Sequence, residues 1–370
     1  MAHKGTSGIA NKLDEIMVNI KETLASGDDS REQDETLEQE LAGEYGHKSV
    51  ESLVLLLDKN RLDDFKTMIE NNGAEGDMED ILRFYVLDKL TEFRAKLDVV
   101  EEELETFSDG SGDLRDQDLG DVFQDIEERI ESAESSLSDA ERVELKFDVT
   151  RYGEGEFSDY NEEVERLKDQ IPEVEEEISS VLGEASNRIG DALEVASAVI
   201  GDLDEESIEE DYNEKLSQLQ GRFTDEELKG LLVSLHNQDL EGARSQLESQ
   251  EQFEEVVEIY VELALRKGQR NLIQVSQELR PVYRVLKEAD EADISYRRLQ
   301  EAGDSLSSVD QDISNAETFI QAAGHAAEKV GVREEYRVLS EELEGIERIG
   351  SDVVKAEERL EEIKLSSGSS

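Results

Sequence analysis

Apolar residues recur at alternating steps of three and four along most of the chain. The stretches with this spacing are 86–107, 123–140, 160–185, 272–286, 299–323 and 339–363. A seven-residue apolar repeat is typical of helices that supercoil against a partner helix. The chain also contains only two prolines, which favours long helices. The pattern therefore predicts an all-α protein built largely from coiled-coil helices.

Breaks between the apolar runs predict how these helices connect. The polar, glycine-rich segments 108–113 and 153–155 each interrupt a run and are typical of turns. Short connections between helices favour antiparallel neighbours in the same chain. Because a helix rises 1.5 Å per residue, an arm of about 30 residues extends about 45 Å. We therefore expect long antiparallel coiled-coil hairpin arms and an elongated molecule.

The chain contains an internal match that indicates two tandem duplicated units. Met78–Val86 resembles Phe253–Val261 in residue type at every position but one, at an offset of 175 positions (253 − 78). The apolar positions of 123–140 fall on those of 299–316 at an offset of 176. Heptad segments can often be aligned by chance, but the first match extends to the type of each side chain. Repeats of this kind predict one structural unit that occurs twice.

Each predicted unit begins with a small helical head. In the second unit, Thr224 and Glu227 form a capping-box signature before predicted helices at 225–236 and 239–249. In the first unit the corresponding helices are expected at 50–59 and 62–71. The predicted organisation is an N-terminal amphipathic helix and acidic linker (1–44), repeat unit 1 (45–185, head 45–87, arm 88–185), a connecting helical segment (186–219), repeat unit 2 (220–365, head 220–263, arm 264–365) and a disordered tail (366–370).

The net charge of the chain indicates the kind of solution in which the protein is folded and active. The chain carries 96 Asp and Glu against 39 Lys and Arg, a formal net charge of −57. Disordered acidic chains lack regular apolar spacing, so we interpret the acidity as that of a folded protein. In molar salt the Debye length falls to about 3 Å and self-repulsion is largely screened. This acidity resembles that of cytoplasmic proteins of haloarchaea or of their viruses, and it predicts a halophilic source.

Targeting and redox signals are consistent with a cytoplasmic location. The chain has no cysteine, which excludes disulfides and thiolate metal sites. Residues 1–25 contain no apolar run of signal-peptide type. No stretch approaches the roughly 18 consecutive apolar residues of a membrane helix, so no membrane insertion is expected.

The sequence contains no recognisable catalytic or metal-binding motif. His3, His47, His236 and His325 are scattered and match no zinc-binding spacing. The acidic segment 109–121 does not place its oxygen ligands and glycine as a calcium loop requires. We therefore expect no catalytic residue, no cofactor and no metal, and we predict that the protein is not an enzyme.

One segment departs from the acidic background, and we call it the cationic stripe. Within 266–287 it contains a single acid, Glu278, and on a helix five of its six cations fall within about 100°. A docking surface for phosphates or for an acidic partner helix is one interpretation. The other is that the stripe neutralises the protein's own acidic arms. Its residues are Arg266, Lys267, Arg270, Arg280, Arg284 and Lys287.

Two functional hypotheses follow from the sequence. The first is a structural or adaptor protein that acts as a scaffold or spacer through contacts with protein partners or further copies of itself. The alternative is a nucleic-acid-associated protein that uses the cationic stripe. High salt weakens electrostatic DNA binding steeply, which makes the alternative less favourable.

Overall fold

The computed structural model describes residues 8–25, 37, 39–43, 45–72, 76, 78–108, 117–147, 156–201, 204–289, 295–331 and 333–363. The elements within these ranges are all helices, which confirms the all-α prediction. The chain divides into two compact units, unit 1 with Met1–Ile178 and Ile363–Ser370, and unit 2 with Ser179–Glu362.

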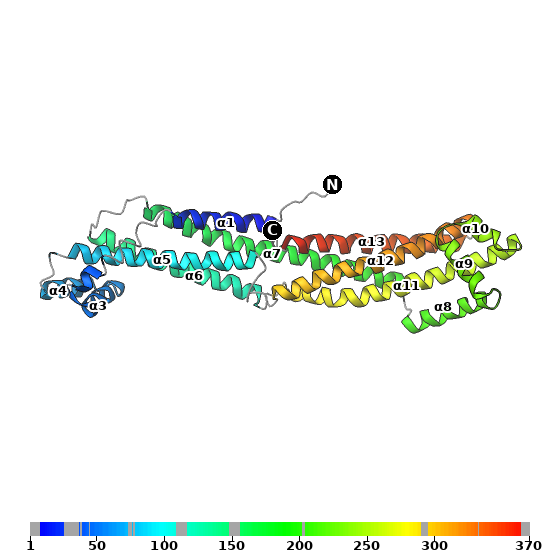
Figure 1. Cartoon of the computed structure of the whole chain (residues 1–370), viewed down its shortest axis with the longest axis horizontal. Coiled ribbons are helices and arrows are strands. Elements are labelled where there is room, and N and C mark those ends of the chain that lie inside the picture. The colour runs from blue at the N-terminus through cyan, green and yellow to red at the C-terminus, as the bar shows by residue number, and fades with distance from the viewer. Residues whose placement is uncertain are drawn as a thin grey trace. The chain divides into compact units, whose positions relative to one another are not determined.

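Unit 1 is organised around one pair of long helices. Helix α5 lies along α6, and α1 packs against α5 (Figure 1). Leu90, Phe93 and Leu97 of α5 are fully or almost fully buried, at the predicted three-and-four spacing. Burial of this apolar stripe stabilises the pair. The helices of unit 1 are α1 (Gly8–Ala25), α3 (His47–Asp58), α4 (Leu62–Asn72), α5 (Met78–Ser108), α6 (Leu119–Phe147) and the first part of α7 (Glu156–Ile200).

Unit 2 is organised around a second pair of long helices. Helix α11 lies along α12, and α8 packs against α11 (Figure 1). The two long helices approach closely at Gly268, where a Cβ atom would lie 2.8 Å from Cδ1 of Ile320. The helices of unit 2 are the second part of α7, α8 (Glu205–Gln220), α9 (Asp225–His236), α10 (Leu240–Ser245), α11 (Gln250–Ala289), α12 (Tyr296–Val330) and α13 (Arg333–Ile363) as far as Glu362.

The head of unit 2 begins as its sequence predicts. The Thr224 hydroxyl accepts a hydrogen bond from the Glu227 backbone N–H (3.4 Å), and the Glu227 carboxylate accepts one from the Thr224 N–H (2.9 Å). This reciprocal pair satisfies two backbone donors that a helix start leaves open. The helix that follows has the predicted bounds, 225–236, whereas α10 ends at Ser245 rather than at 249.

The turn after the first head helix has the same backbone geometry in both units. Asn60 and Gln238 have φ angles of 53° and 61°. Their N–H groups donate to the carbonyls of Leu57 and Leu235, at 2.9 and 3.0 Å. These turns lie 178 positions apart (238 − 60). This separation is three positions longer than the 175 positions that relate the Met78–Val86 segment to its match (178 − 175).

Candidate functional site

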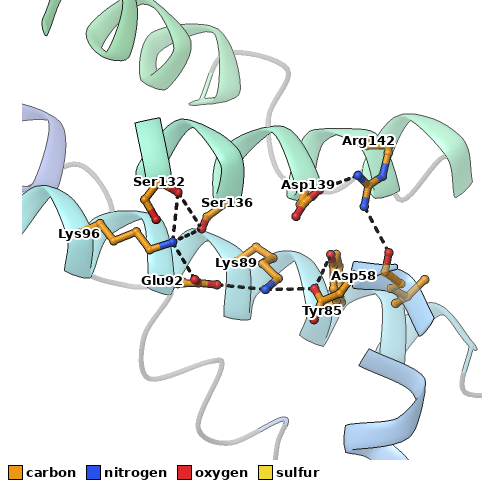
Figure 2. A network of polar contacts seen from close by, with 10 residues as sticks. Asp58, Tyr85, Lys89, Glu92, Lys96, Ser132, Ser136, Asp139 and Arg142 are labelled. Carbon is orange, nitrogen blue, oxygen red and sulfur yellow. Dashed lines mark hydrogen bonds and ion pairs between the residues drawn. The ribbon is translucent and has the colours of Figure 1, made fainter. Parts of the chain in front are cut away.

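A buried tyrosine forms the centre of a polar cluster in unit 1. The Tyr85 hydroxyl donates a hydrogen bond of 3.0 Å to Oδ1 of Asp58 (Figure 2). The Lys89 ammonium lies 3.1 Å from the same carboxylate oxygen. Tyr85 is 0% exposed, and burial together with the Asp58 charge raises the pKa of its hydroxyl. The tyrosine is therefore a protonated donor whose acceptor, Asp58, is the last residue of α3.

The cluster continues along α5 and across to α6. Glu92 accepts from Lys89 (3.0 Å) and forms an ion pair with Lys96 (2.7 Å). The Lys96 ammonium in turn donates to the Ser136 hydroxyl at 2.8 Å. Nearby on α6, Arg142 donates to the Leu57 carbonyl at 3.2 Å (Figure 2). Side chains of α3, α5 and α6 thus fill this part of unit 1 with paired polar groups.

Unit 2 has a tyrosine at the matching position, with different neighbours. Tyr260 is 5% exposed, and its hydroxyl oxygen is buried without a hydrogen-bond partner among the described residues. His236 is the last residue of α9, as Asp58 is the last residue of α3. Its Nδ1 atom is likewise buried and unpartnered, and its ring lies 4.9 Å from that of Phe319. The first head helix of unit 1 thus ends in a carboxylate that accepts from a buried tyrosine, whereas that of unit 2 ends in an imidazole whose Nδ1 has no described hydrogen-bond partner.

A cavity of about 430 Å³ is lined in part by Tyr260 and His236, although the Tyr260 hydroxyl and the His236 Nδ1 atom are themselves buried. Its walls come from α8, α9, α11 and α12. The other walls are mainly apolar, and they include Leu228, Leu263 and Phe319. A volume of this size falls within the range of small-molecule sites, which combine apolar walls with a few polar groups. We call this space the unit 2 cavity.

The charged lining of the unit 2 cavity favours an anion. Lys229 and Lys267 line it, against a single carboxylate, that of Asp225. Lys267 belongs to the predicted cationic stripe, whereas sequence reasoning missed Tyr260 and His236. The signal that could have pointed to Tyr260 is the tyrosine present in both Met78–Val86 and Phe253–Val261, whereas His236 lies outside both segments.

The N-terminal half of the cationic stripe faces α8. The Arg266 guanidinium lies 3.0 Å from the Asp211 carboxylate, and that of Arg270 lies 3.9 Å from Glu209. Arg266 also donates to the Gln269 side chain at 2.9 Å. These two cations therefore neutralise carboxylates of the protein's own helix α8, which is not one of the acidic arms that the sequence suggested.

The C-terminal half of the stripe has a different environment. Arg280, Arg284 and Lys287 are exposed, and none forms an ion pair with another described residue. Lys287 lies over the Tyr283 ring, 5.8 Å from its centroid. The structure thus divides the six cations into Arg266 and Arg270 paired with α8, Lys267 at the cavity, and three that remain on the surface.

Removing the hydroxyl of Tyr85 is expected to destabilise the protein, whereas removing that of Tyr260 is not. Tyr85→Phe should lower the free energy of unfolding by about 1–2 kcal/mol, because Asp58 loses a hydrogen bond in a part-buried site. Tyr260→Phe should be neutral or slightly stabilising, because it removes a buried hydroxyl that has no described partner. Urea denaturation followed by circular dichroism at constant KCl measures both changes. Equal losses from the two substitutions would contradict the different environments.

The described residues offer neither a metal centre nor a bilayer-spanning helix. Within them, no three His, Asp or Glu side chains gather in a way that could hold a metal ion. None of the described helices combines the length and the apolar character that crossing a bilayer requires. No protein-family model matches the chain, and no curated protein or solved structure is significantly similar to it.

Proposed function

We propose that the chain is a non-enzymatic adaptor made of two tandem duplicated units, and that unit 2 docks an acidic protein partner. The order of elements supports the duplication, because two short head helices precede a pair of long helices in each unit. The matching turns at Asn60 and Gln238 and the buried Tyr85 and Tyr260 support it further. A duplicated protein can keep one copy as a framework while the other acquires a binding role.

The long helix pairs suit a scaffold or spacer. We interpret α5 with α6, and α11 with α12, as antiparallel coiled-coil hairpins, because their buried residues follow the three-and-four spacing of such seams. The length of a helical arm is set by its residue count at 1.5 Å per residue. The net charge of −57 favours work in a salt-rich cytoplasm, such as that of a halophilic archaeon, where the self-repulsion is screened.

The observation that carries the proposal is the exposed half of the cationic stripe. Arg280, Arg284 and Lys287 follow one another at helical spacings of four and three, so they share one face of α11. No described carboxylate pairs with them, although the chain has 96 acidic residues. An unpaired cationic face in an acidic protein attracts and orients an acidic partner.

Nucleic-acid binding through the stripe is the less favoured alternative. Arg266 and Arg270 are already paired with α8 and Lys267 lines the unit 2 cavity, which leaves three surface cations for phosphate contacts. Binding to nucleic acid through phosphate contacts weakens steeply as salt rises. With only three cations available for such contacts, the surface would bind nucleic acid weakly in a salt-rich cell. A protein surface can add apolar contacts, which salt does not weaken.

A charge-reversal variant tests the proposal. The full chain carrying Arg280→Glu, Arg284→Glu and Lys287→Glu is used as bait in lysate of the cell that makes the protein, at about 2 M KCl. We expect the protein recovered by the wild-type bait to fall by more than about tenfold, because reversed charges repel an acidic partner. Mass spectrometry of the bound fraction gives the ratio.

A matched control separates docking from net charge. Lys329→Glu, Arg348→Glu and Lys355→Glu change the charge equally at exposed positions of α12 and α13 in the same unit. This control is expected to keep the partner. If both variants lose it equally, or if nuclease treatment alone removes the bound material, the adaptor proposal is wrong.

A further inference from the structure

We propose that helix α3 of one copy of the chain docks at the unit 2 cavity of a second copy, and that Leu55 is the side chain that enters the cavity. Such a contact joins two unlike surfaces of the same protein, so it links copies into rings or open chains. Arg280, Arg284 and Lys287 take no part in it, and its assay contains no other protein. Its failure and the failure of the adaptor proposal are therefore distinguishable.

The first head helices of the two units have the same pattern of burial. Leu57 of α3 and Leu235 of α9 are both 0% exposed. Two residues before each of them, Leu55 and Val233 are both 49% exposed. These pairs have the same separation as the two head turns, 178 positions (233 − 55). Each head therefore presents an apolar side chain that its own unit leaves partly uncovered.

The two exposed side chains have different surroundings. Val233 lines the unit 2 cavity, next to apolar walls that include Leu232 and Phe319. Leu55 instead lies on the exposed side of α3, between the exposed residues Glu51 and Lys59. Moving a leucine side chain from water to an apolar recess is favourable, and salt does not weaken that gain. Unit 1 thus supplies an apolar projection, and unit 2 supplies a recess that can receive it.

The charges beside these residues are complementary when the two helices run antiparallel. Along α3, Glu51 comes four residues before Leu55 and Lys59 four residues after it. Along the cavity wall of α9, Asp225 comes before Lys229. Both helices thus have the acid before the cation, so antiparallel docking sets each acid opposite a cation of the other helix. None of these four charged side chains forms an ion pair with another described residue.

A second copy is the occupant that these features select. The projection and the recess are both present on one chain, and their charges match without a further component. The net charge of −57 opposes association of two copies in dilute salt. In molar salt the Debye length of about 3 Å screens that repulsion, while charges in direct contact still interact. We therefore expect self-association under the salt-rich conditions that the composition predicts.

Sedimentation equilibrium of the purified full chain at about 2 M KCl measures this association. We expect the wild type to associate reversibly with a Kd between about 10 μM and 0.5 mM, as a small transient contact does. Leu55→Glu and Val233→Glu each place a charge in the apolar contact and should each weaken association by more than about tenfold. Both positions are exposed, so both variants should keep the wild-type circular dichroism. Val18→Glu changes a similarly exposed residue of α1 (51%) and should associate as the wild type does.

A mixture of the two variants identifies the contact. The Leu55→Glu copy keeps an intact cavity, and the Val233→Glu copy keeps an intact α3 surface. An equimolar mixture should therefore recover association and stop at the dimer, because only one contact can form. The proposal is overturned if the wild type is monomeric up to about 0.5 mM. It is also overturned if either variant associates as the wild type does, or if the mixture stays monomeric.

Exchanging one pair of charges tests the orientation. Glu51→Lys should weaken association by about threefold, because it sets two cations against each other. Adding Lys229→Glu in the same chain restores an opposite pair and should restore the affinity. If the double variant stayed as weak as Glu51→Lys alone, the antiparallel arrangement would be wrong.

Discussion

Replacing Phe93 with alanine is expected to lower the free energy of unfolding of unit 1 by about 3–5 kcal/mol. Phe93 is 0% exposed, and its ring lies 5.2 Å from that of Tyr160 in α7. Arg94 also contacts Tyr160, because its guanidinium lies over the Tyr160 ring and donates a hydrogen bond to the Tyr160 hydroxyl. The substitution removes an aromatic pair and leaves a cavity between α5 and α7, which close-packed neighbours fill only in part.

Urea denaturation at constant KCl measures the loss. Hydrogen exchange read on peptides of α5 and α6 assigns it to unit 1. Phe93→Leu is the control, because it keeps most of the volume and should cost about 1–2 kcal/mol. If the alanine variant lost less than about 1 kcal/mol, α5 and α7 would not pack as the structure has them.

Replacing Glu342 with glutamine is expected to stabilise unit 2 at pH 8 by up to about 3 kcal/mol. Burial raises the pKa of the Glu342 carboxyl from 4.5 to about 7, against smaller opposing effects of Gln269 and Arg266. The Gln269 side-chain amide donates to this carboxyl at 3.3 Å, and Arg266 donates to Gln269. Glutamine keeps an acceptor for that amide while removing a charge that burial disfavours.

The sign of the effect follows from the two pKa values. Below pH 4.5 the carboxyl is protonated in both states, and the protonated form is the one that the fold favours. Stability from this group is lost as pH rises from 4.5 through about 7, because the folded state must then ionise a buried acid. The advantage of Glu342→Gln should therefore shrink to below about 1 kcal/mol at pH 5.

Thermal or urea unfolding at pH 5 and pH 8 measures the difference between Glu342→Gln and wild type. The neighbouring exposed acid provides a control, since Glu341 pairs with Arg337 at the surface. Glu341→Gln should show no gain that grows with pH. If Glu342→Gln changed the free energy of unfolding equally at pH 5 and pH 8, burial would not raise the pKa of Glu342 and the prediction would be wrong.

Part of the candidate site could be anticipated from sequence, and part could not. The retained tyrosine in Phe253–Val261 is visible by comparison with Met78–Val86. Glu342 could also have been noticed, because it lies three residues after Leu339 and four before Ile346, at the spacing of buried positions. The contacts of each group could not be read, because Asp58 accepts from Tyr85 across 27 positions and Gln269 donates to Glu342 across 73 positions of the chain.

The sequence by itself determined which segments are helical and which face of each is buried. Helix formation and apolar periodicity are local properties, so 225–236 begins and ends as predicted, and the residues of the heptad runs are largely buried. Only the tertiary structure decided which side chains from distant helices meet. The angles on one helix place Arg266 and Arg284 on one face, but they do not show that α8 covers the first and leaves the second exposed.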